Sequence, residues 1–420
     1  MTRIKDLLTP YKGLPREVYV LFISRIVNAL GCFVMPLLAF ILTKNVGLSS
    51  EKAGFYMSVS GLLYLPASII GGKLADTIGR KKVIIFFDTI AAILYIICGF
   101  MTPSMDMVYV IMFAGASMVA AGPAHDSLIA DLTIPENRKG AYSLCYMGWN
   151  IGFAVGPFIG GILYKNHLPW IFIGDALTAL LSLSLIAIFI KETIHKTEQE
   201  ITDENRVLEK REEGSIISVL LKRPILIYFA LITFGFNFVY SQWGFLMPLH
   251  SEQNFLVNGA YYYGIMASFN GIVVMLFTPI VTKLGEKTQN IRLMVYGGIL
   301  YTIGFGMLGF LNTLLFFFVS VFIFTIGEIL LSISTSPFIA NHTPASHRGR
   351  MSAALPIIFG MGYTLGPWGM GKILTHVTIE HAWILIGILG VISTTFMLCL
   401  EKYENKKSAQ DINEDEILEG

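Results

Sequence analysis

The stretch GGKLADTIGRKKV, residues 71–83, lies between two long apolar runs and decides the fold. It holds four basic residues, Lys73, Arg80, Lys81 and Lys82. Basic residues in the short loops of membrane proteins stay on the cytoplasmic side. We therefore expect this segment to be a cytoplasmic loop between two membrane-spanning helices.

Two other residues of this loop indicate a gate. Gly79 has the backbone freedom that a tight reversal of the chain needs. Asp76 ends the first apolar run, where its charge opposes the dipole of its own helix. It would be better placed if it capped the N-terminus of another helix or paired with an arginine. We interpret Asp76 as a latch.

The composition of the chain is that of a bilayer protein. Of its 420 residues, 54% are hydrophobic and only 14% are charged, which is too apolar for an ordinary soluble protein. A spanning helix needs about 20 apolar residues, and twelve windows meet this need. They cover residues 17–43, 53–72, 83–102, 107–130, 140–164, 170–190, 224–248, 259–281, 292–311, 314–338, 351–375 and 382–400.

The positions of lysine and arginine set the orientation. If both termini are cytoplasmic, four of the 30 basic residues face outward and one, Arg25, lies within a span. The outward residues are Lys44, Lys52, Lys165 and Lys372. All others fall on the inner side, as the positive-inside rule requires. We therefore predict an all-α membrane protein with twelve transmembrane helices in two pseudo-symmetric six-helix bundles and with both termini cytoplasmic.

The same windows divide the chain into parts. We predict an N-terminal six-helix bundle over residues 1–190, a cytoplasmic linker over 191–223, a C-terminal six-helix bundle over 224–402 and a polar cytoplasmic tail over 403–420. The linker mixes charges of both signs, which is typical of a solvated segment. We assign no structure to the tail, because it is polar and mostly acidic.

An internal repeat relates the two bundles. A shift of 210 residues aligns Lys73, Leu74 and Asp76 with Lys283, Leu284 and Glu286, Arg138 with Arg348, and Gly152, Gly156 and Pro157 with Gly362, Gly366 and Pro367. Because the copies are six helices apart, both have the same orientation in the membrane, which indicates a parallel repeat.

Glycines recur every four residues in the fifth window, at positions 148, 152, 156 and 160. This spacing clears one face of the helix, so that another backbone can approach closely. Pro157 interrupts the hydrogen-bond ladder and permits a kink. The eleventh window repeats the pattern. We assign to helix packing Gly152, Gly156, Pro157, Gly362, Gly366 and Pro367.

Glu328 is the most informative ionisable residue, because it lies near the middle of the tenth window, about 15 Å from water. Charging a carboxylate at this depth costs about 2.5–3.5 kcal/mol, and protonating an ordinary glutamate at pH 7 costs about 3.7 kcal/mol. Since the two costs are close, we expect Glu328 to change protonation as its surroundings alternate between dry and wet. The alternative is a carboxyl that stays protonated in a hydrogen bond to a neighbouring helix.

Other charged residues lie nearer the ends of the windows. Arg25 is about 12 Å into the first window, so it should face a cavity or an acid. Asp126 and Asp131 are candidate partners for Arg25 or Arg80, in an ion pair that is either static or moving. We assign Asp88 and Asp175 to structure.

Aromatic and amide side chains form the candidate substrate contacts. A cavity walled by rings and amides, with one acid, suits bulky amphipathic or cationic cargo. Some of these residues must instead be interfacial anchors or lie against lipid. The candidates are Arg25, Asn28, Tyr146, Trp149, Asn150, Asn237, Tyr240, Gln242 and Asn270.

Four segments together resemble the bacterial proton-driven multidrug antiporters of the major facilitator superfamily. They are the G-x-L-A-D-x-x-G-R-K loop, the link AGPAHDSLIADLTIPENRKG at 121–140, the GxxxGP helix and the IGE segment at 326–328. The resemblance spans nearly the whole chain. It implies that Asp76 and Arg80, on a loop shaped by Gly72 and Gly79, latch the inner gate, and that Asp131 or Asp126 completes the network.

The resemblance also implies that Glu328 stands where such exporters carry a membrane-embedded coupling acid. The chain departs from the pattern at three places. Arg25 and Asn28 stand where many relatives place an acid, Cys145 stands where some have another, and the fourth window offers Gly115 to Gly122 without the arginine that antiporters often show. Proton coupling would then depend mainly on Glu328.

The predicted function is therefore secondary active transport, by proton-coupled efflux of amphipathic or cationic small molecules through alternating access. The alternatives are proton-coupled or facilitative transport of one metabolite, sugar or lipid and, more remotely, a membrane sensor that binds a ligand without moving it. The partners expected are a small-molecule substrate, protons and the lipid bilayer, without nucleic acid, for a monomer in a bacterial inner membrane.

The sequence offers no sign of an enzyme or of a cofactor. It has no nucleotide-binding loop and no HExxH segment. His342 with His347, and His376 with Glu380 and His381, have poor spacing for metal ligands. All four cysteines fall within predicted spans and lack CxxC spacing, so we assign them to packing.

Overall fold

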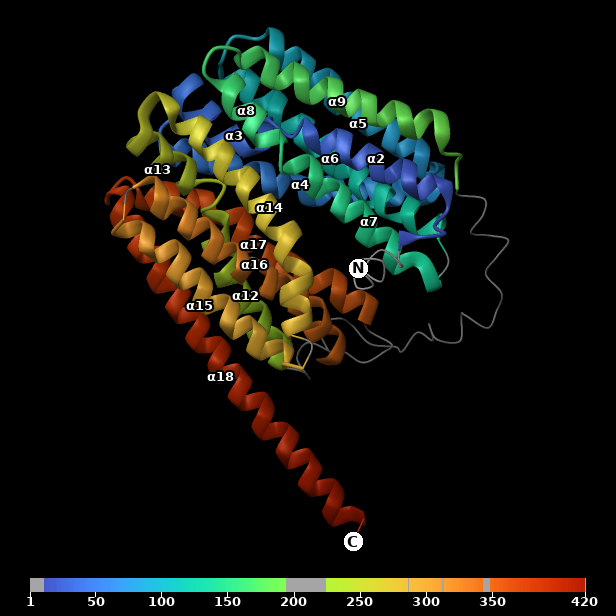
Figure 1. Ribbon diagram of the computed structural model, residues 1–420, viewed down its shortest axis with the longest axis vertical. Helices are drawn as coiled ribbons and strands as arrows, with labels where there is room; N and C mark the ends of the chain where they lie inside the picture. Colours follow the sequence, from blue (N-terminus) through green and yellow to red (C-terminus); the bar gives the residue numbers. More distant parts are fainter. Residues whose placement is uncertain are drawn as a thin grey trace, which may run out of the picture. The chain divides into compact units, whose positions relative to one another are not determined.

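The structure is a computed structural model that describes residues 11–133, 135–193, 224–285, 287–311, 313–342 and 348–419. All the regular secondary structure in these ranges is helical (Figure 1). The predicted all-α fold is therefore confirmed.

The first six predicted windows all coincide with helices. The first window is divided into three helical segments, and the fifth is divided into two. The elements are α2 (Arg16–Leu30), α3 (Val34–Phe40), the π-helix η2 (Ile41–Asn45), α4 (Ser50–Ile78), α5 (Arg80–Phe100), α6 (Met105–Asp131), α7 (Pro135–Phe153), α8 (Gly156–Tyr164) and α9 (Leu168–Phe189).

The last six windows coincide with helices as well. The elements are α12 (Pro224–Ser241), α13 (Leu246–Phe255), the short 3-10 helix η4 (Leu256–Asn258), α14 (Gly259–Gly285), α15 (Asn290–Gly306), the 3-10 helix η5 (Met307–Gly309), α16 (Leu314–His342), α17 (Arg348–Ile373) and α18 (Ile379–Glu419). Within the described ranges, nine stretches are long and apolar enough to cross a membrane, one of them spanning Pro224–Gly285. The number of twelve spans stays a prediction.

The C-terminal tail is helical, although no structure was expected for it from the sequence. Helix α18 continues through the tail to Glu419 (Figure 1). Two ion pairs hold the part of α18 that precedes and enters the tail. Arg292 Nε, on α15, lies 2.6 Å from Glu401 Oε1, and His342 Nε2, on α16, lies 2.9 Å from Glu404 Oε1. The tail is also rich in glutamate and lysine, which favour helix even without an apolar face.

Residue contacts divide the chain into two compact units. The first unit comprises Met1–Thr202 and Met247–Met275, and the second comprises Asp203–Leu246 and Leu276–Gly420. The predicted boundary between bundles fell in the 191–223 linker, whereas this division also groups α13 and the first part of α14 with the first unit. Residues 194–223 of the linker lie outside the described residues.

Glycines mark equivalent close helix contacts in the two units. A Cβ atom on Gly152 of α7 would lie 2.4 Å from the carbonyl oxygen of Ile26 on α2. A Cβ atom on Gly362 of α17 would lie 2.1 Å from the carbonyl oxygen of Phe234 on α12. The α2–α7 contact and the α12–α17 contact are therefore copies of one packing arrangement.

The two copies differ at the proline. Pro157 lies in the first turn of α8, directly after a break between α7 and α8 at residues 154–155. Pro367 lies inside the continuous helix α17. Gly156 and Gly366 lie beside these prolines, and a Cβ atom on either would meet a neighbouring helix at less than 3 Å, namely the carbonyl oxygen of Ala29 at 2.7 Å and Ser241 Oγ at 1.8 Å.

We expect Gly362→Ala to destabilise the second unit, because its Cβ atom collides with backbone that cannot move without separating α17 from α12. Overpacking of this kind costs about 1–3 kcal/mol. Gly360→Ala is the matched control on the same helix, since no atom lies within 4 Å of the added Cβ. Thermal unfolding in detergent should show a lower midpoint for the first variant only, and equal midpoints would contradict the close contact.

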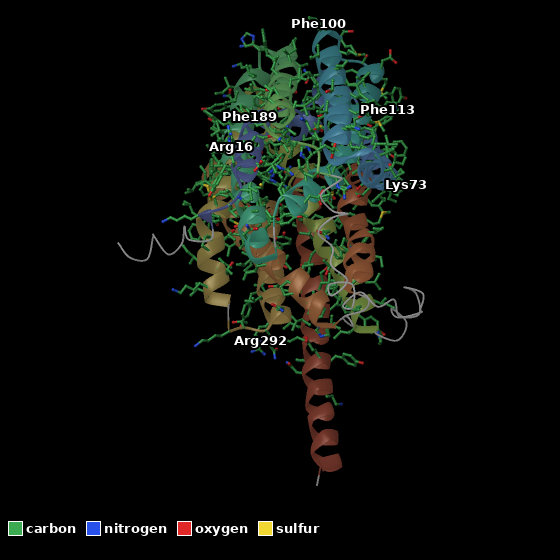
Figure 2. The ribbon with its side chains drawn as sticks, turned by 90° about the vertical axis from the view of Figure 1, so that its right-hand side faces the viewer. Arg16, Lys73, Phe100, Phe113, Phe189 and Arg292 are labelled. Carbon is green, nitrogen blue, oxygen red and sulfur yellow. The ribbon has the colours of Figure 1, made fainter. Side chains whose placement is uncertain are left out.

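The outer surfaces of both units carry large apolar side chains. Phe100 on α5 and Phe113 on α6, labelled in Figure 2, are 81% and 60% exposed. Exposed apolar surface of this extent is typical of a protein that lies in hydrocarbon.

Candidate functional site

Glu328 lies at the centre of α16, about 21 Å from either end of the helix. Its position is set by a contact between glycines of neighbouring helices. A Cβ atom on Gly327 would lie 2.8 Å from the carbonyl oxygen of Gly297 on α15, and one on Gly297 would lie 3.0 Å from the carbonyl oxygen of Gly327. The two backbones therefore touch here, which brings Tyr301, one turn beyond Gly297, next to Glu328.

Three tyrosines from three helices surround the Glu328 carboxyl group. The Tyr240 hydroxyl, on α12, forms a hydrogen bond with it, and Tyr301 and Tyr363 are close enough to interact with its charge. The rings of Tyr240 and Tyr301 are stacked, with centroids 5.7 Å apart, and those of Tyr240 and Tyr363 are 6.3 Å apart. We call Glu328, Tyr240, Tyr301 and Tyr363 the acid–tyrosine cluster.

The cluster has one dry side and one open side. Tyr301 is buried and packs edge-on against Phe305, whose ring stacks on Phe324 at 4.5 Å and on Trp383 at 5.9 Å. On the other side, Tyr363 is 50% exposed, and Glu328 itself is half-buried. Glu328 therefore lies between buried aromatic rings, which keep the local dielectric low, and partly exposed side chains.

The predicted gate forms a compact polar network inside the first unit. Arg80 Nε lies 3.0 Å from Asp131 Oδ2, and both side chains are nearly buried. Arg80 also donates from Nη1 to the carbonyl oxygen of Ala75. The Thr193 hydroxyl donates to Asp131 Oδ2 over 2.7 Å. The network thus joins the ends of α4, α5 and α6 to the segment that follows α9.

Glu192 is a member of this network that the sequence analysis assigned to the linker. Its carboxylate accepts hydrogen bonds from the backbone N–H groups of Arg80 at 2.8 Å, Lys82 at 3.3 Å and Lys81 at 3.4 Å. It therefore caps the N-terminus of α5, where the helix dipole favours an anion. No motif announces this contact, because residues 192 and 80 are distant in the chain.

Hydrogen bonding sets the pKa of Glu192. Burial raises the pKa of this carboxyl group, but backbone N–H donors at Thr193, Lys82, Lys81 and Arg80 lower it more, so that its pKa falls below the ordinary value. A lowered pKa in the folded state means that the charged form stabilises the fold. This stabilisation is complete above the ordinary glutamate pKa of about 4.3 and is lost as the pH falls through the lowered value.

We expect Glu192→Gln to lower the unfolding temperature at neutral pH. The expected loss of unfolding free energy is about 0.3–1 kcal/mol, which is what a charge contributes at a helix terminus. The difference from the native protein should shrink as the pH falls from about 4.3 through the lowered pKa of Glu192, because the carboxyl group is then protonated first in the unfolded state and afterwards in the folded state. Thermal unfolding of both proteins in detergent over this pH range checks the prediction. A difference that does not change with pH would mean that the charge is not what stabilises α5.

Two glycines of the gate loop have different surroundings. Gly79 has φ = +114° and ψ = 150°, a conformation that side-chain-bearing residues avoid, and a Cβ atom on it would lie 2.4 Å from Glu192 Oε2. Gly72 is helical, and its Cβ atom would make an ordinary contact of 3.6 Å with Pro123. The expected tight reversal therefore lies at Gly79. The side chain of Asp76, the predicted latch, lies outside the described residues.

The remaining gate candidate, Asp126, lies beside Arg25. Arg25 Nη2 is 3.9 Å from Asp126 Oδ1, and the Asp126 side chain is 71% exposed. Ion pairs as long and exposed as this one contribute about 0–1 kcal/mol. The two candidate acids near the end of α6 thus divide between the two arginines, with Asp131 on Arg80 and Asp126 on Arg25.

The candidate substrate contacts are placed unequally. Gln242 is fully buried, and its amide donates to the carbonyl oxygen of Phe238 and to Ser241 Oγ. The Asn237 and Asn150 amides donate to the carbonyl oxygens of Phe359 and Tyr146. Asn150 and Asn270 are buried, which favours packing roles for the amides in this conformation. Arg25, Asn28, Trp149 and Tyr240 are half-buried and Tyr146 is 56% exposed, so that these side chains are reachable.

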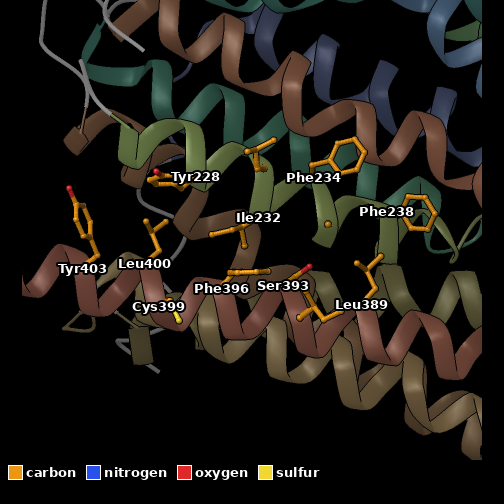
Figure 3. A pocket seen from close by; sticks show the side chains of 13 residues that line it. Tyr228, Ile232, Phe234, Phe238, Leu389, Ser393, Phe396, Cys399, Leu400 and Tyr403 are labelled. Carbon is orange, nitrogen blue, oxygen red and sulfur yellow. The ribbon is translucent and has the colours of Figure 1, made fainter. Parts of the chain in front are cut away.

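A large groove lies elsewhere in the second unit, between α12 and α18 (Figure 3). It has a volume of about 770 Å³ and is lined by apolar side chains such as Phe234, Phe238 and Phe396. Its lining contains neither Glu328 nor any other charged residue. Among the described residues, no group of three or more His, Cys, Asp or Glu side chains could hold a metal ion.

Comparison with known proteins places this geometry in context. The sequence model of the Major Facilitator Superfamily matches residues 21–355 and 264–418. The chain is 21% identical to a "Na(+), Li(+), K(+)/H(+) antiporter" of Planococcus maritimus, over 90% of this chain and 94% of the relative. It is 24% identical to "Multidrug resistance protein 2" of Bacillus subtilis (strain 168), over 94% of this chain and 98% of the relative.

Solved structures show the same fold. A POT family transporter in complex with a thioalcohol-conjugated peptide superposes with a TM-score of 0.78 at 15% identity, covering 94% of this chain and 97% of that chain.

Proposed function

We propose that this chain, which belongs to the Major Facilitator Superfamily, exports amphipathic or cationic small molecules in exchange for protons. The family and the relatives are transporters, so that the chain is a multi-pass membrane transporter of small molecules.

The observation that carries the proposal is the acid–tyrosine cluster. Glu328 lies at mid-helix and has a hydrogen-bonding tyrosine, a stack of aromatic rings behind it and one open side. Tyrosine faces attract organic cations, and a carboxylate attracts them further when it is charged. A proton that binds to Glu328 removes this attraction, which couples proton entry to release of a cationic substrate.

Alternating access would supply the change of surroundings. The 210-residue repeat and the paired glycine contacts of α7 and α17 support two bodies of related construction. In the first unit, the network of Arg80, Asp131 and Glu192 would hold the ends of α5 and α6 rigid during this motion. We assign the gating role to this network.

The names of the relatives support an exchange with protons but leave the cargo open. One is a metal-ion/proton antiporter, and another is a multidrug resistance protein. Transport of one metabolite, sugar or lipid remains the second candidate from the sequence. Such a substrate would need a specific set of polar contacts, whereas the described amides of Gln242, Asn237 and Asn150 are already used within the protein.

Purified protein in liposomes tests the proposal. Ethidium, sodium ions, a dipeptide and glucose are offered singly, with and without a pH gradient, and an ionophore that collapses the gradient is the control. We expect ethidium to move against its own gradient, opposite in direction to the protons, and to stop when the pH gradient collapses. Exclusive movement of sodium, dipeptide or glucose, or ethidium movement that is insensitive to the pH gradient, would overturn the proposal.

A further inference from the structure

The first unit also contains a pair of one acid and one histidine, which belongs neither to the gate network nor to the acid–tyrosine cluster. His125 Nε2, on α6, lies 2.9 Å from Asp88 Oδ2, on α5, and the two side chains are only 17% and 18% exposed. Asp88 was expected to have a structural role, because it lies near the start of a predicted window. Helix α5 begins earlier, at Arg80, so that Asp88 lies about 12 Å along it.

Asp88 also borders a small chamber. The chamber has a volume of about 20 Å³, and its polar lining consists of Asn28, Asp88, Tyr95 and Asp175, with alanine and methionine side chains between them. These residues come from α2, α5 and α9. A water molecule needs about 10–15 Å³ of such volume and two to four polar partners, so that the chamber has room for one water molecule.

Tyr95 supplies an independent sign that the chamber is occupied. Its side chain is 2% exposed, and its hydroxyl group has no hydrogen-bond partner among the described residues. A buried hydroxyl group left in this state costs about 1–3 kcal/mol. A water molecule in the chamber would remove this cost and would join the Tyr95 hydroxyl to the Asn28 and Asp88 side chains.

The acidic residues on the two sides of the pair differ in exposure. Asp126, the residue after His125, is 71% exposed and lies beside Arg25. The exposed surface of α6 thus begins at the residue next to His125, whose own side chain is 17% exposed. At the far end, Asp175 is buried, and its Oδ2 atom accepts the backbone N–H groups of Phe33 and Val34, which holds it in place at the start of α3.

We propose that Asp88 and His125 form a second proton-binding site of the transporter, served by a water molecule bound to Tyr95 and Asn28. With one proton on the imidazole, the pair is an electrically neutral Asp⁻·HisH⁺ unit. Release of that proton through water to the bulk leaves one negative charge on Asp88 and a neutral His125. Only the use of this proton in the transport cycle rests on the proposed function.

An unpaired buried charge costs far more than a neutral pair, so that the ionisable groups around Asp88 bear on the release of the proton. Arg25 lies one turn before Asn28 on α2, where its guanidinium is 3.9 Å from Asp126. The other titratable groups around the pair and the chamber are Cys32 between α2 and α3, Tyr64 on α4, Tyr95 and Cys98 on α5, Asp126 on α6 and Asp175 on α9.

Proton uptake by the purified full chain in detergent tests the site without any substrate. A pH-indicator dye counts the protons taken up between about pH 8 and pH 5, the range in which histidine changes charge. We expect His125→Gln to take up one proton fewer than the native protein. His250→Gln is the matched control, because His250 is buried and hydrogen-bonded to the Asn254 amide, and the uptake of this variant should equal that of the native protein.

Two further variants separate this site from an ordinary histidine. Asp88→Asn should change the proton uptake that depends on His125, because the imidazole loses the carboxylate 2.9 Å away. Tyr95→Phe should also change it, because the water molecule loses a partner. If Asp88→Asn leaves the uptake curve unchanged, the pair is not a proton site. If Tyr95→Phe leaves it unchanged and raises the unfolding temperature, the chamber is dry and the proposal is overturned.

Glu328→Gln distinguishes this inference from the proposed function. The proton uptake that depends on His125 should persist in Glu328→Gln, even though transport driven by protons is lost. Loss of that uptake in Glu328→Gln would overturn the assignment of an independent second site. If Glu328→Gln and His125→Gln both kept proton-driven ethidium transport, the proposed function would fail. The uptake measurement would still decide whether Asp88 and His125 bind a proton.

Discussion

Glu328→Gln should abolish uphill transport in liposomes while leaving downhill exchange of the same probe intact. The amide keeps the size of the side chain and can still hydrogen-bond the Tyr240 hydroxyl, but it cannot take up a proton. A pH difference of one unit is equivalent to about 1.4 kcal/mol per proton, or about a tenfold concentration ratio. The variant should therefore lose an accumulation of about tenfold under such a gradient.

Glu328→Asp is the conservative control for this prediction. It keeps a titratable group at the same place, one methylene farther from Tyr240, so that accumulation should be reduced and not lost. The measurement is the steady-state ratio of ethidium across the membrane, with and without the pH gradient. Accumulation by Glu328→Gln that matches the native protein would mean that the protons bind elsewhere and that the acid–tyrosine cluster does not couple them.

Gly79→Ala should be the most damaging small substitution in the gate. The residue has φ = +114° and ψ = 150°, a region that only glycine occupies readily, and forcing another residue there costs about 1–3 kcal/mol. The added Cβ atom would also lie 2.4 Å from Glu192 Oε2, and that carboxylate is held by the backbone of Arg80. We expect a lower unfolding temperature and slower transport, since the capping of α5 and the Arg80–Asp131 contact both depend on this turn.

Gly72→Ala tests whether this effect is specific to Gly79. It changes the same residue type near the end of α4, but its Cβ atom makes only an ordinary contact with Pro123. Both variants are compared by thermal unfolding in detergent and by initial transport rate. Equal losses for the two would show that the loop tolerates no side chain anywhere, and equal neutrality would show that the turn at Gly79 relaxes without cost.

The gate shows how far sequence patterns reach. The motif predicted that Arg80 would meet an acid of α6, but it left Asp126 and Asp131 as alternatives, because both lie near the same end of that helix. The structure places Asp131 on Arg80 at 3.0 Å and Asp126 at 3.9 Å from Arg25. Glu192 was missed altogether, since a cap contributed by a residue more than a hundred positions away leaves no local signal.

The acid–tyrosine cluster shows the same limit. The depth of Glu328 followed from counting residues in an apolar window, because helix rise per residue is constant. Its tyrosine neighbours did not follow. Tyr240 was one aromatic candidate among many, whereas Tyr301 and Tyr363 come from helices whose rotation depends on packing at Gly297, Gly327 and Gly362.

The sequence by itself determined the all-α class, the helical windows, the 210-residue repeat and the glycine-lined helix faces. These features depend on hydrophobicity and spacing along the chain, which apolar run lengths record directly. Only the tertiary structure decided which acid meets which arginine, that Glu192 caps α5, and that His125 lies against Asp88 beside a small chamber. Such contacts depend on the rotation of each helix about its axis, which close packing sets and which no single segment of the sequence encodes.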